Sequence, residues 1–271
     1  MNLSCLSTID CTQGAVRAVR FNVDGTYCLT CGADKKIKLW NPYRHLMLKT
    51  YGGHAGEVLD VCASCDSSQI VSCSADKSVI VWDVSTGQPL KRYRGHAAGA
   101  TCLALNEDST IAISGSLDNT LMCWDLRARG DSACQTLREA KDCISTVRIS
   151  DVEILSGSVD GCARRYDLRN GKCDEDFVGG TYTGHKIDSF TIESEVITND
   201  NYILSGSVDG NVWCWDLVSG EVKYKYTHER NKVVQSISVH PKKDAFLSAS
   251  TNTIKLWGDA SEIPLEEQSG N

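Results

Sequence analysis

Histidine, serine and aspartate recur together in this chain in a pattern that resembles the catalytic residues of a hydrolase. The sets are His54, Ser74 and Asp76; His96, Ser116 and Asp118; and His185, Ser207 and Asp209. In a nucleophilic triad the imidazole takes the proton of the serine hydroxyl, and the carboxylate orients the imidazole. Such a centre needs one oriented set beside an oxyanion hole and a cleft. Repetition of the whole set therefore favours a structural role.

A tryptophan follows each set, six residues after the aspartate, at Trp82, Trp124 and Trp215. We expect the aspartate to accept a hydrogen bond from the imidazole, the imidazole to contact the serine hydroxyl, and the hydroxyl to contact the indole N–H. Such a network satisfies buried polar groups and ties strands together. The sequence thus predicts structural networks, and it predicts no catalytic, metal-binding or cofactor-binding residues.

These networks belong to a repeat. Six segments end in an aromatic residue at positions 40, 82, 124, 166, 215 and 257, with spacings of 42, 42, 42, 49 and 42. Repeat one has Gly32 at the serine position and no histidine, repeat four has Tyr166 and no histidine, and repeat six has His228 but no turn aspartate. We expect these three to form looser structures.

Each repeat reads as four short β-strands between turns. Gly-His near the start and Trp-Asp near the end, every 40-odd residues, are typical of a propeller blade. Over residues 3–258 the chain resembles the WD-repeat β-propellers, which implies an all-β fold with six recognisable four-stranded blades. Residues 6–10 align with the fourth strands 48–52 and 90–94, so the N-terminal strand should complete the last blade. We assign residues 1–258 to the propeller and 259–271 to an acidic, disordered tail.

The composition argues against several other classes. The net charge is −7 and the pI about 5.4, whereas nucleic acids and anionic membranes attract basic surfaces. We see no secretory signal and no membrane span, so disulfides are not expected among the 14 cysteines. Cys28 and Cys31 form a CxxC pair but lie on a predicted strand, where they would point to opposite faces. Buried free thiols are favoured over zinc.

Residues 14–42, 153–172, 216–222 and 233–241 resemble, more closely, the WD-repeat proteins that organise mitogen-activated protein kinase cascades. That resemblance implies a non-enzymatic scaffold in the cytoplasm and nucleus. Its implied partners are components of the extracellular-signal-regulated kinase cascade, spliceosomal proteins and an oxygen-sensing prolyl hydroxylase. Direct contact with DNA, RNA or membranes is not expected, although Arg127, Arg129, Arg164, Arg165 and Arg169 form a basic cluster.

Two features suggest where partners bind. Arg127 and Arg169 each end an Asp-x-Arg motif like that of WD-repeat substrate receptors of cullin–RING ubiquitin ligases, which is the alternative function. Apolar residues also precede the turn aspartates. Leu117, Val159 and Val208 would form a binding surface if they are exposed.

The repeat is irregular at DEDFVGGTYTGHK, residues 174–186, where two strand ends follow one another. An insertion would explain the extra length but not the duplicated strand end. The resembled group carries seven repeats, and its additional repeat falls near Gly179–Gly180. We therefore interpret the chain as a form that lacks one repeat.

Overall fold

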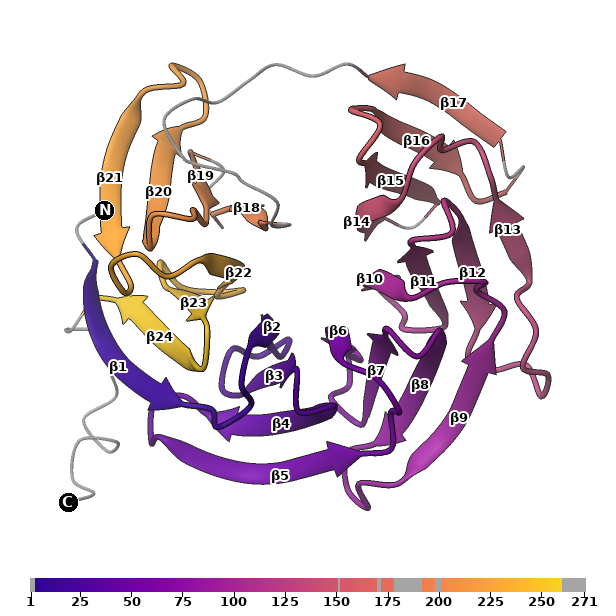
Figure 1. Cartoon of the computed structure of the whole chain (residues 1–271), viewed down its shortest axis with the longest axis horizontal. Coiled ribbons are helices and arrows are strands. Elements are labelled where there is room, and N and C mark those ends of the chain that lie inside the picture. The colour runs from indigo at the N-terminus through magenta and orange to yellow at the C-terminus, as the bar shows by residue number, and fades with distance from the viewer. Residues whose placement is uncertain (1–2, 151, 170–171, 178–191, 198–200, 260–271) are drawn as a thin grey trace. The chain divides into compact units, whose positions relative to one another are not determined.

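Six antiparallel sheets make up the regular structure of this protein (Figure 1). The computed structural model describes residues 3–150, 152–169, 172–177, 192–197 and 201–259. Within these ranges all regular elements are β-strands, and each sheet has four. No helix long and apolar enough to cross a membrane occurs in the same ranges. The predicted all-β propeller fold with six four-stranded blades is confirmed.

The described residues fall into two compact units of three blades, which we treat separately. The terminal unit contains residues 1–50 and 182–271, and the middle unit contains residues 51–181. Assignment of residues 1–258 to a single domain stays a prediction. The predicted tail, beyond Asp259, and the irregular joint with His185 lie outside the described residues.

Blades one, five and six belong to the terminal unit. Blade one comprises β2 (Val16–Phe21), β3 (Cys28–Gly32), β4 (Lys36–Asn41) and β5 (Leu46–Gly52). Blade five comprises β18 (Ser194–Val196), β19 (Tyr202–Ser205), β20 (Asn211–Asp216) and β21 (Val222–Thr227). Blade six comprises β22 (Val234–Val239), β23 (Phe246–Ser250), β24 (Thr253–Gly258) and β1 (Ser4–Asp10).

The N-terminal strand completes blade six, as the sequence predicted. β1 pairs antiparallel with β24 and places Ile9 opposite Ile254. Ile9 is buried against Leu247 and other apolar residues, while its neighbour Thr8 is exposed. The first and last described strands therefore share one sheet, and β1 covers the edge that β24 would otherwise expose.

Blades two, three and four belong to the middle unit. Blade two comprises β6 (Val58–Ala63), β7 (Gln69–Ser74), β8 (Ser78–Asp83) and β9 (Pro89–Arg94). Blade three comprises β10 (Ala100–Leu105), β11 (Ile111–Ser116), β12 (Leu121–Asp125) and β13 (Gln135–Leu137). Blade four comprises β14 (Ile144–Ile149), β15 (Glu153–Ser158), β16 (Ala163–Asp167) and β17 (Lys172–Phe177).

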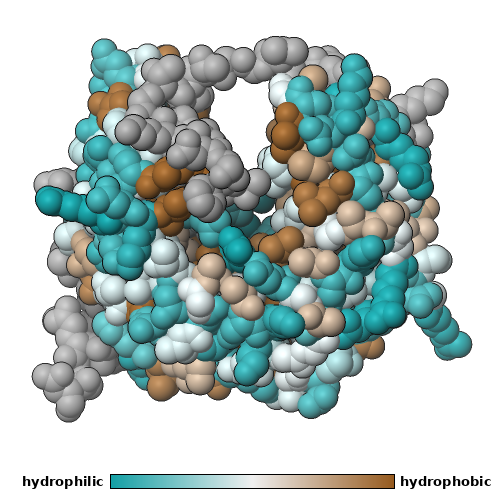
Figure 2. Space-filling model, viewed as in Figure 1, coloured by the Kyte–Doolittle hydropathy of each residue, from teal (hydrophilic) through white to brown (hydrophobic). Residues whose placement is uncertain are grey.

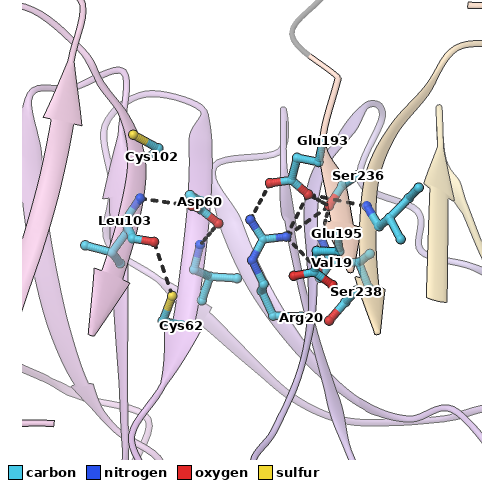
Figure 3. A network of polar contacts seen from close by, with 12 residues as sticks. Val19, Arg20, Asp60, Cys62, Cys102, Leu103, Glu193, Glu195, Ser236 and Ser238 are labelled. Carbon is cyan, nitrogen blue, oxygen red and sulfur yellow. Dashed lines mark hydrogen bonds and ion pairs between the residues drawn. The ribbon is translucent and has the colours of Figure 1, made fainter. Parts of the chain in front are cut away.

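Side chains on the first strand of a blade bind the backbone of the next blade in the same unit. In the middle unit, Asp60 accepts a hydrogen bond from the amide of Leu103 at 3.0 Å (Figure 3). In the terminal unit, Ser236 and Ser238 accept from the amides of Val19 and Phe21 at 3.0 and 3.1 Å. These bonds fix the register between neighbouring first strands, because each joins a side chain to one specific amide.

A partly buried ion pair adds to these contacts in the terminal unit. Arg20 is 8% exposed, and its guanidinium lies 2.8 Å from Glu193 and 3.1 Å from the hydroxyl of Ser236 (Figure 3). Glu193 also accepts from the amide of Ile237 at 3.3 Å. A buried charge is tolerated where a partner charge and further hydrogen bonds surround it. Blades five, six and one are therefore joined by one polar cluster.

Candidate functional site

Blade two shows the polar network in full. Ser72 accepts a hydrogen bond from Trp82 Nε1 at 2.8 Å and lies 2.8 Å from His54 Nε2. His54 Nδ1 lies 3.0 Å from Asp76 Oδ2. An indole N–H only donates and a carboxylate only accepts. A neutral imidazole with its proton on Nδ1 therefore satisfies every partner, with the hydroxyl of Ser72 donating to Nε2.

Blade three repeats this arrangement. Ser114 lies 2.9 Å from Trp124 Nε1 and 2.7 Å from His96 Nε2, and His96 Nδ1 lies 3.1 Å from Asp118. The distances match those of blade two within a few tenths of an ångström. The network is thus a property of the repeat rather than of one site.

The predicted serines were wrong, because Ser72 and Ser114 take the places expected for Ser74 and Ser116. In the β7–β8 pair Trp82 lies opposite Ile70, so Ser72 is its diagonal neighbour on the same face. Ser74 lies a further two residues along the strand, and its hydroxyl accepts from the amide of Asp76 at 3.1 Å. Ser116 does the same for the amide of Asp118.

A sequence signal for the correct position was present. A hydroxyl residue stands ten positions before the aromatic residue in the first five repeats and nine before it in the sixth. These residues are Thr30, Ser72, Ser114, Ser156, Ser205 and Ser248. All six are buried.

The turn aspartate binds two segments at once. Asp76 Oδ1 accepts from the amide of Ser78 at 3.0 Å and so closes the β7–β8 turn. Its Oδ2 accepts from His54 and from the amide of Ala55 at 2.7 Å, in the loop that enters the blade. Burial raises the pKa of Asp76, but hydrogen bonds from Ser78, Ala55 and His54 outweigh it and hold the pKa below its usual range.

The residue after the turn aspartate, or after Ser250 in blade six, adopts a left-handed conformation in every blade. The φ values are 64° at Lys35, 70° at Lys77, 67° at Asn119, 84° at Gly161, 85° at Gly210 and 48° at Thr251. This conformation is unfavourable for residues other than glycine. In blades one to three, where this residue is lysine or asparagine, the carboxylate that caps the turn therefore also holds a strained backbone in place.

Blade one has a complete network built from other residues, so its predicted incompleteness was wrong. Gln13 Oε1 accepts from Thr30 at 2.5 Å, and Gln13 Nε2 donates to Asp34 at 3.1 Å. Trp40 Nε1 donates to Thr30 at 2.8 Å. A neutral amide has one acceptor and one donor group and can replace the neutral imidazole. Gln13 was missed because its loop is one residue shorter than that of His54.

Blade six also forms a network. His228 lies 2.6 Å from Ser248 and 3.0 Å from Thr253, whose hydroxyl stands in for the missing carboxylate. Trp257 donates to Ser248 at 2.8 Å. Burial, with the positive charge of Lys255, lowers the pKa of His228 to about 4. The sequence placed His228 correctly but gave no indication of Thr253.

Blade four departs furthest from the pattern. Ala140 stands where the other middle-unit blades have histidine, and the amide of Lys141 donates to Asp160 at 2.9 Å. Arg164, 2% exposed, approaches the same carboxylate to 2.9 Å. The hydroxyl of Ser156 has no hydrogen-bond partner among the described residues. Of the three blades predicted to be looser, only this one lacks the network.

Blade five is described in part, since His185 lies outside the described residues. Trp215 is 1% exposed, and Ser207 accepts from the amide of Asp209 at 3.4 Å. Ser205 accepts from the hydroxyl of Ser194 at 2.9 Å. Ser207 thus occupies the same turn position as Ser74 and Ser116.

The networks have no geometry for nucleophilic attack. Ser72 and Ser114 are fully buried, and each accepts the N–H of a tryptophan. Burial lowers the pKa values of His54 and His96, although the neighbouring aspartates act in the opposite direction. A serine that no substrate can reach cannot act as a nucleophile. These residues connect the blade instead.

The cysteines of the CxxC pair are buried in the same way as these serines. Cys28 and Cys31 both lie on β3 and are fully buried, opposite Trp40 and Ile37. Burial raises the pKa of Cys28 well above its usual value. Over the described ranges, no group of three His, Cys, Asp or Glu residues is placed to hold a metal ion.

The predicted apolar contact residues lie largely on the surface. Leu117 is 53% exposed and Val159 is 57% exposed. With the exposed Ala75 they occupy equivalent turns of three successive middle-unit blades, and we call these three residues the turn surface. Val208, in the terminal unit, is half-buried. On the face that Figure 2 shows, hydrophobic residues form small separate groups among hydrophilic ones.

The two motif arginines are exposed, but both lie close to the aspartate of their own motif. The side chain of Arg127 is 74% exposed and approaches Asp125 to 3.9 Å. That of Arg169 is 72% exposed and lies 2.6 Å from Asp167. The expected basic cluster is divided, because Arg164 is buried and cannot meet a nucleic acid.

Comparison with known proteins places these blades in a family. The WD domain, G-beta repeat model matches residues 3–41, 46–83, 87–125, 178–216 and 220–258. The chain is 52% identical to WD repeat domain-containing protein 83 of Rattus norvegicus over 93% of this chain and 91% of the relative. The Xenopus tropicalis protein is 50% identical over 97% and 94%, and the Homo sapiens protein 47% over 93% and 91%.

These alignments bear on the number of residues in the chain. The alignment with the rat protein has 287 positions, more than the 271 residues of the whole chain. The relative therefore has residues that this chain lacks. The matched segments also leave out residues 126–177, the repeat with Ala140 and Tyr166.

Substitution of the two serines of β7 distinguishes their roles. Ser72→Ala removes the acceptor of Trp82 and the donor to His54, and we expect it to lower the free energy of unfolding by about 2 kcal/mol. Ser74→Ala removes only a turn hydrogen bond, so its cost should be smaller. Urea denaturation of both variants gives the comparison, and a larger cost at Ser74 would contradict the assignment.

The buried histidines predict acid sensitivity. The pKa of His228 is 6.5 when unperturbed and about 4 in the folded protein. Between pH 4 and pH 6.5 the unfolded chain therefore binds more protons than the folded protein. The free energy of unfolding should fall by about 1.4 kcal/mol for each pH unit below pH 6.5, until the folded pKa is passed. Denaturation of the protein and of His228→Gln between pH 4 and 7.5 tests this.

The variant should show a shallower decline, because glutamine can take both hydrogen bonds without titrating. His45→Gln, at an exposed position, is the control. Equal slopes for the protein and His228→Gln would assign the sensitivity to other groups.

The interpretation that this chain lacks one repeat predicts a second transcript. A form about 44 residues longer, close to one repeat of this family, should insert its extra residues near Gly179–Gly180. Sequencing of transcripts and of the gene tests this. A gene without a coding segment at that point would exclude the interpretation.

Proposed function

Because this chain belongs to the WD-repeat family and, within it, to the group of WD repeat domain-containing protein 83, we propose that it is a non-enzymatic scaffold. WD-repeat propellers are protein-interaction platforms. Our proposal is that this one organises components of the extracellular-signal-regulated kinase cascade and also joins pre-mRNA splicing complexes. It would act in the cytoplasm and nucleus, and a prolyl hydroxylase is a further candidate partner.

The signalling and splicing roles are supported by sequence resemblance. Residues 14–42 and 153–172 resemble the WD-repeat proteins that organise mitogen-activated protein kinase cascades. The structural observation that carries the scaffold role is the turn surface. Three apolar side chains on adjacent turns of rigid blades offer a preformed contact that needs no ordering on binding.

Substrate reception for a cullin–RING ligase is the second candidate. Its support is the exposure of Arg127 and Arg169 in matching motifs of successive blades. An adaptor would have to compete with Asp125 and Asp167 for the two guanidinium groups. Arginine pairs of this kind act as anchors only when the interface excludes water.

Purification of the tagged protein from cells, followed by mass spectrometry, tests the proposal. Leu117→Glu with Val159→Glu should remove kinase-cascade or splicing partners, because a buried carboxylate without a partner disfavours an apolar interface. The fold should remain, since both side chains are exposed. Unchanged partners in this variant would exclude the turn surface.

Leu90→Glu with Val152→Glu is the matched control, because both residues are exposed in the same unit but away from these turns. It should retain the partners. For the second candidate, Arg127→Glu with Arg169→Glu should abolish capture of the adaptor. An adaptor that never co-purifies with the unaltered protein would eliminate the receptor function.

A further inference from the structure

Three loops of the terminal unit enclose a pocket that the scaffold function leaves unassigned. They are the β2–β3 turn (24–27), the β4–β5 loop (41–44) and the β22–β23 turn (240–243). The cavity has a volume of about 300 Å³. That is the lower end of the range of small-molecule sites in proteins, large enough for one or two side chains of a partner.

The floor of the pocket is held by His240, which is 2% exposed. Its Nδ1 accepts from the amides of Lys242 and Lys243, both at 3.0 Å. Its other ring nitrogen faces Gly25, where a Cβ atom would lie only 2.0 Å away. Gly25 also has a φ of 73°. Any side chain at this position would therefore collide with the ring and separate the two turns.

The β4–β5 loop is also attached to Gly25. The hydroxyl of Tyr43 donates to the carbonyl of Gly25 at 3.2 Å. Asn41 accepts from the amides of Tyr43 and Arg44, both at 3.0 Å. The backbone that carries the basic residues is thus positioned before any ligand arrives, which reduces the entropy cost of binding.

The charge of the pocket is opposite to that of the chain. Arg44, Lys242 and Lys243 line it, together with one carboxylate, Asp24, which lies 3.5 Å from Lys242. The chain as a whole carries a net charge of −7. Burial and the two lysines lower the pKa of His240, so the ring stays a neutral acceptor. A local excess of cations in an acidic protein favours an anionic ligand.

We propose that this pocket binds an oxyanion carried by a segment of a partner protein, either a phosphorylated or a carboxylate side chain. The guanidinium of Arg44 and the ammonium groups of Lys242 and Lys243 form charge-assisted hydrogen bonds to its oxygens. Tyr27 and Tyr43 supply hydroxyls and aromatic surface for the flanking residues. This inference rests on the scaffold function and adds to it a second contact, on blades one and six.

Fluorescence anisotropy with the purified full chain tests the pocket. The probes are short labelled peptides that are identical except for phosphoserine, glutamate or serine at the central position. The anionic peptides should bind and the serine peptide should not. Lys242→Glu with Lys243→Glu should weaken binding about tenfold or more, as loss of charge-assisted bonds predicts.

Lys35→Glu with Lys36→Glu is the matched control. It makes the same change in net charge with two consecutive exposed lysines of blade one, at the β3–β4 turn. This control should retain binding. Lys242→Arg with Lys243→Arg keeps the charge and should also retain it, which separates loss of charge from loss of folding.

A preference for phosphoserine supports a phosphoryl ligand, and equal affinities support a carboxylate. If neither anionic peptide binds, the proposal is overturned. It is also overturned if the pocket variant (Lys242→Glu with Lys243→Glu) and the control variant (Lys35→Glu with Lys36→Glu) lose the same amount of peptide affinity. Neither result would change the outcome of the test of the scaffold proposal, in which partners are purified with the protein and with its turn-surface variant. Conversely, failure of the scaffold proposal in cells would leave peptide binding by the purified chain measurable.

Discussion

The turn carboxylate is the interaction on which the networks of blades one, two and three depend. Asp76 closes the turn between the second and third strands, holds Lys77 in a left-handed conformation, and binds the loop that enters the blade through His54. The histidine in turn orients a buried serine toward the tryptophan of the third strand. One ionised group, with its pKa held low by hydrogen bonds, thus fixes three separate segments.

The blades fill the same roles with different residues. Gln13 replaces histidine in blade one, and Thr253 replaces the carboxylate in blade six. In blade four the network is absent and Arg164 neutralises the turn aspartate instead. The requirement that the four observed networks share is an acceptor for the N–H of their tryptophan and a partner for the hydroxyl that accepts it. Blades that use histidine meet it only in the neutral state, whereas the amide of Gln13 does not titrate.

Periodicity predicted the blades and the pairing of β1, because strand alternation and turn residues are local signals. It did not predict which serine joins the network. Ser72 and Ser74 share a face, and only the register opposite Trp82 separates them. Gln13 escaped notice because one residue fewer in its loop shifts the alignment. The basic pocket was equally hidden, since Gly25, Arg44 and Lys242 come from three loops far apart in the sequence.

Among the described residues, the polar networks of blades one, two, three and six each close within one repeat and the loop that precedes it. His54 and Trp82 mark the ends of the network in blade two, and none of its hydrogen bonds reaches blade three. Between blades, the first strands are joined by side-chain contacts to backbone amides, such as Asp60 to Leu103. Every residue except proline has a backbone amide N–H, so these contacts place little demand on the sequence of the neighbouring blade. Gain or loss of an entire repeat between blades joined in this way would therefore leave the network inside each of them intact.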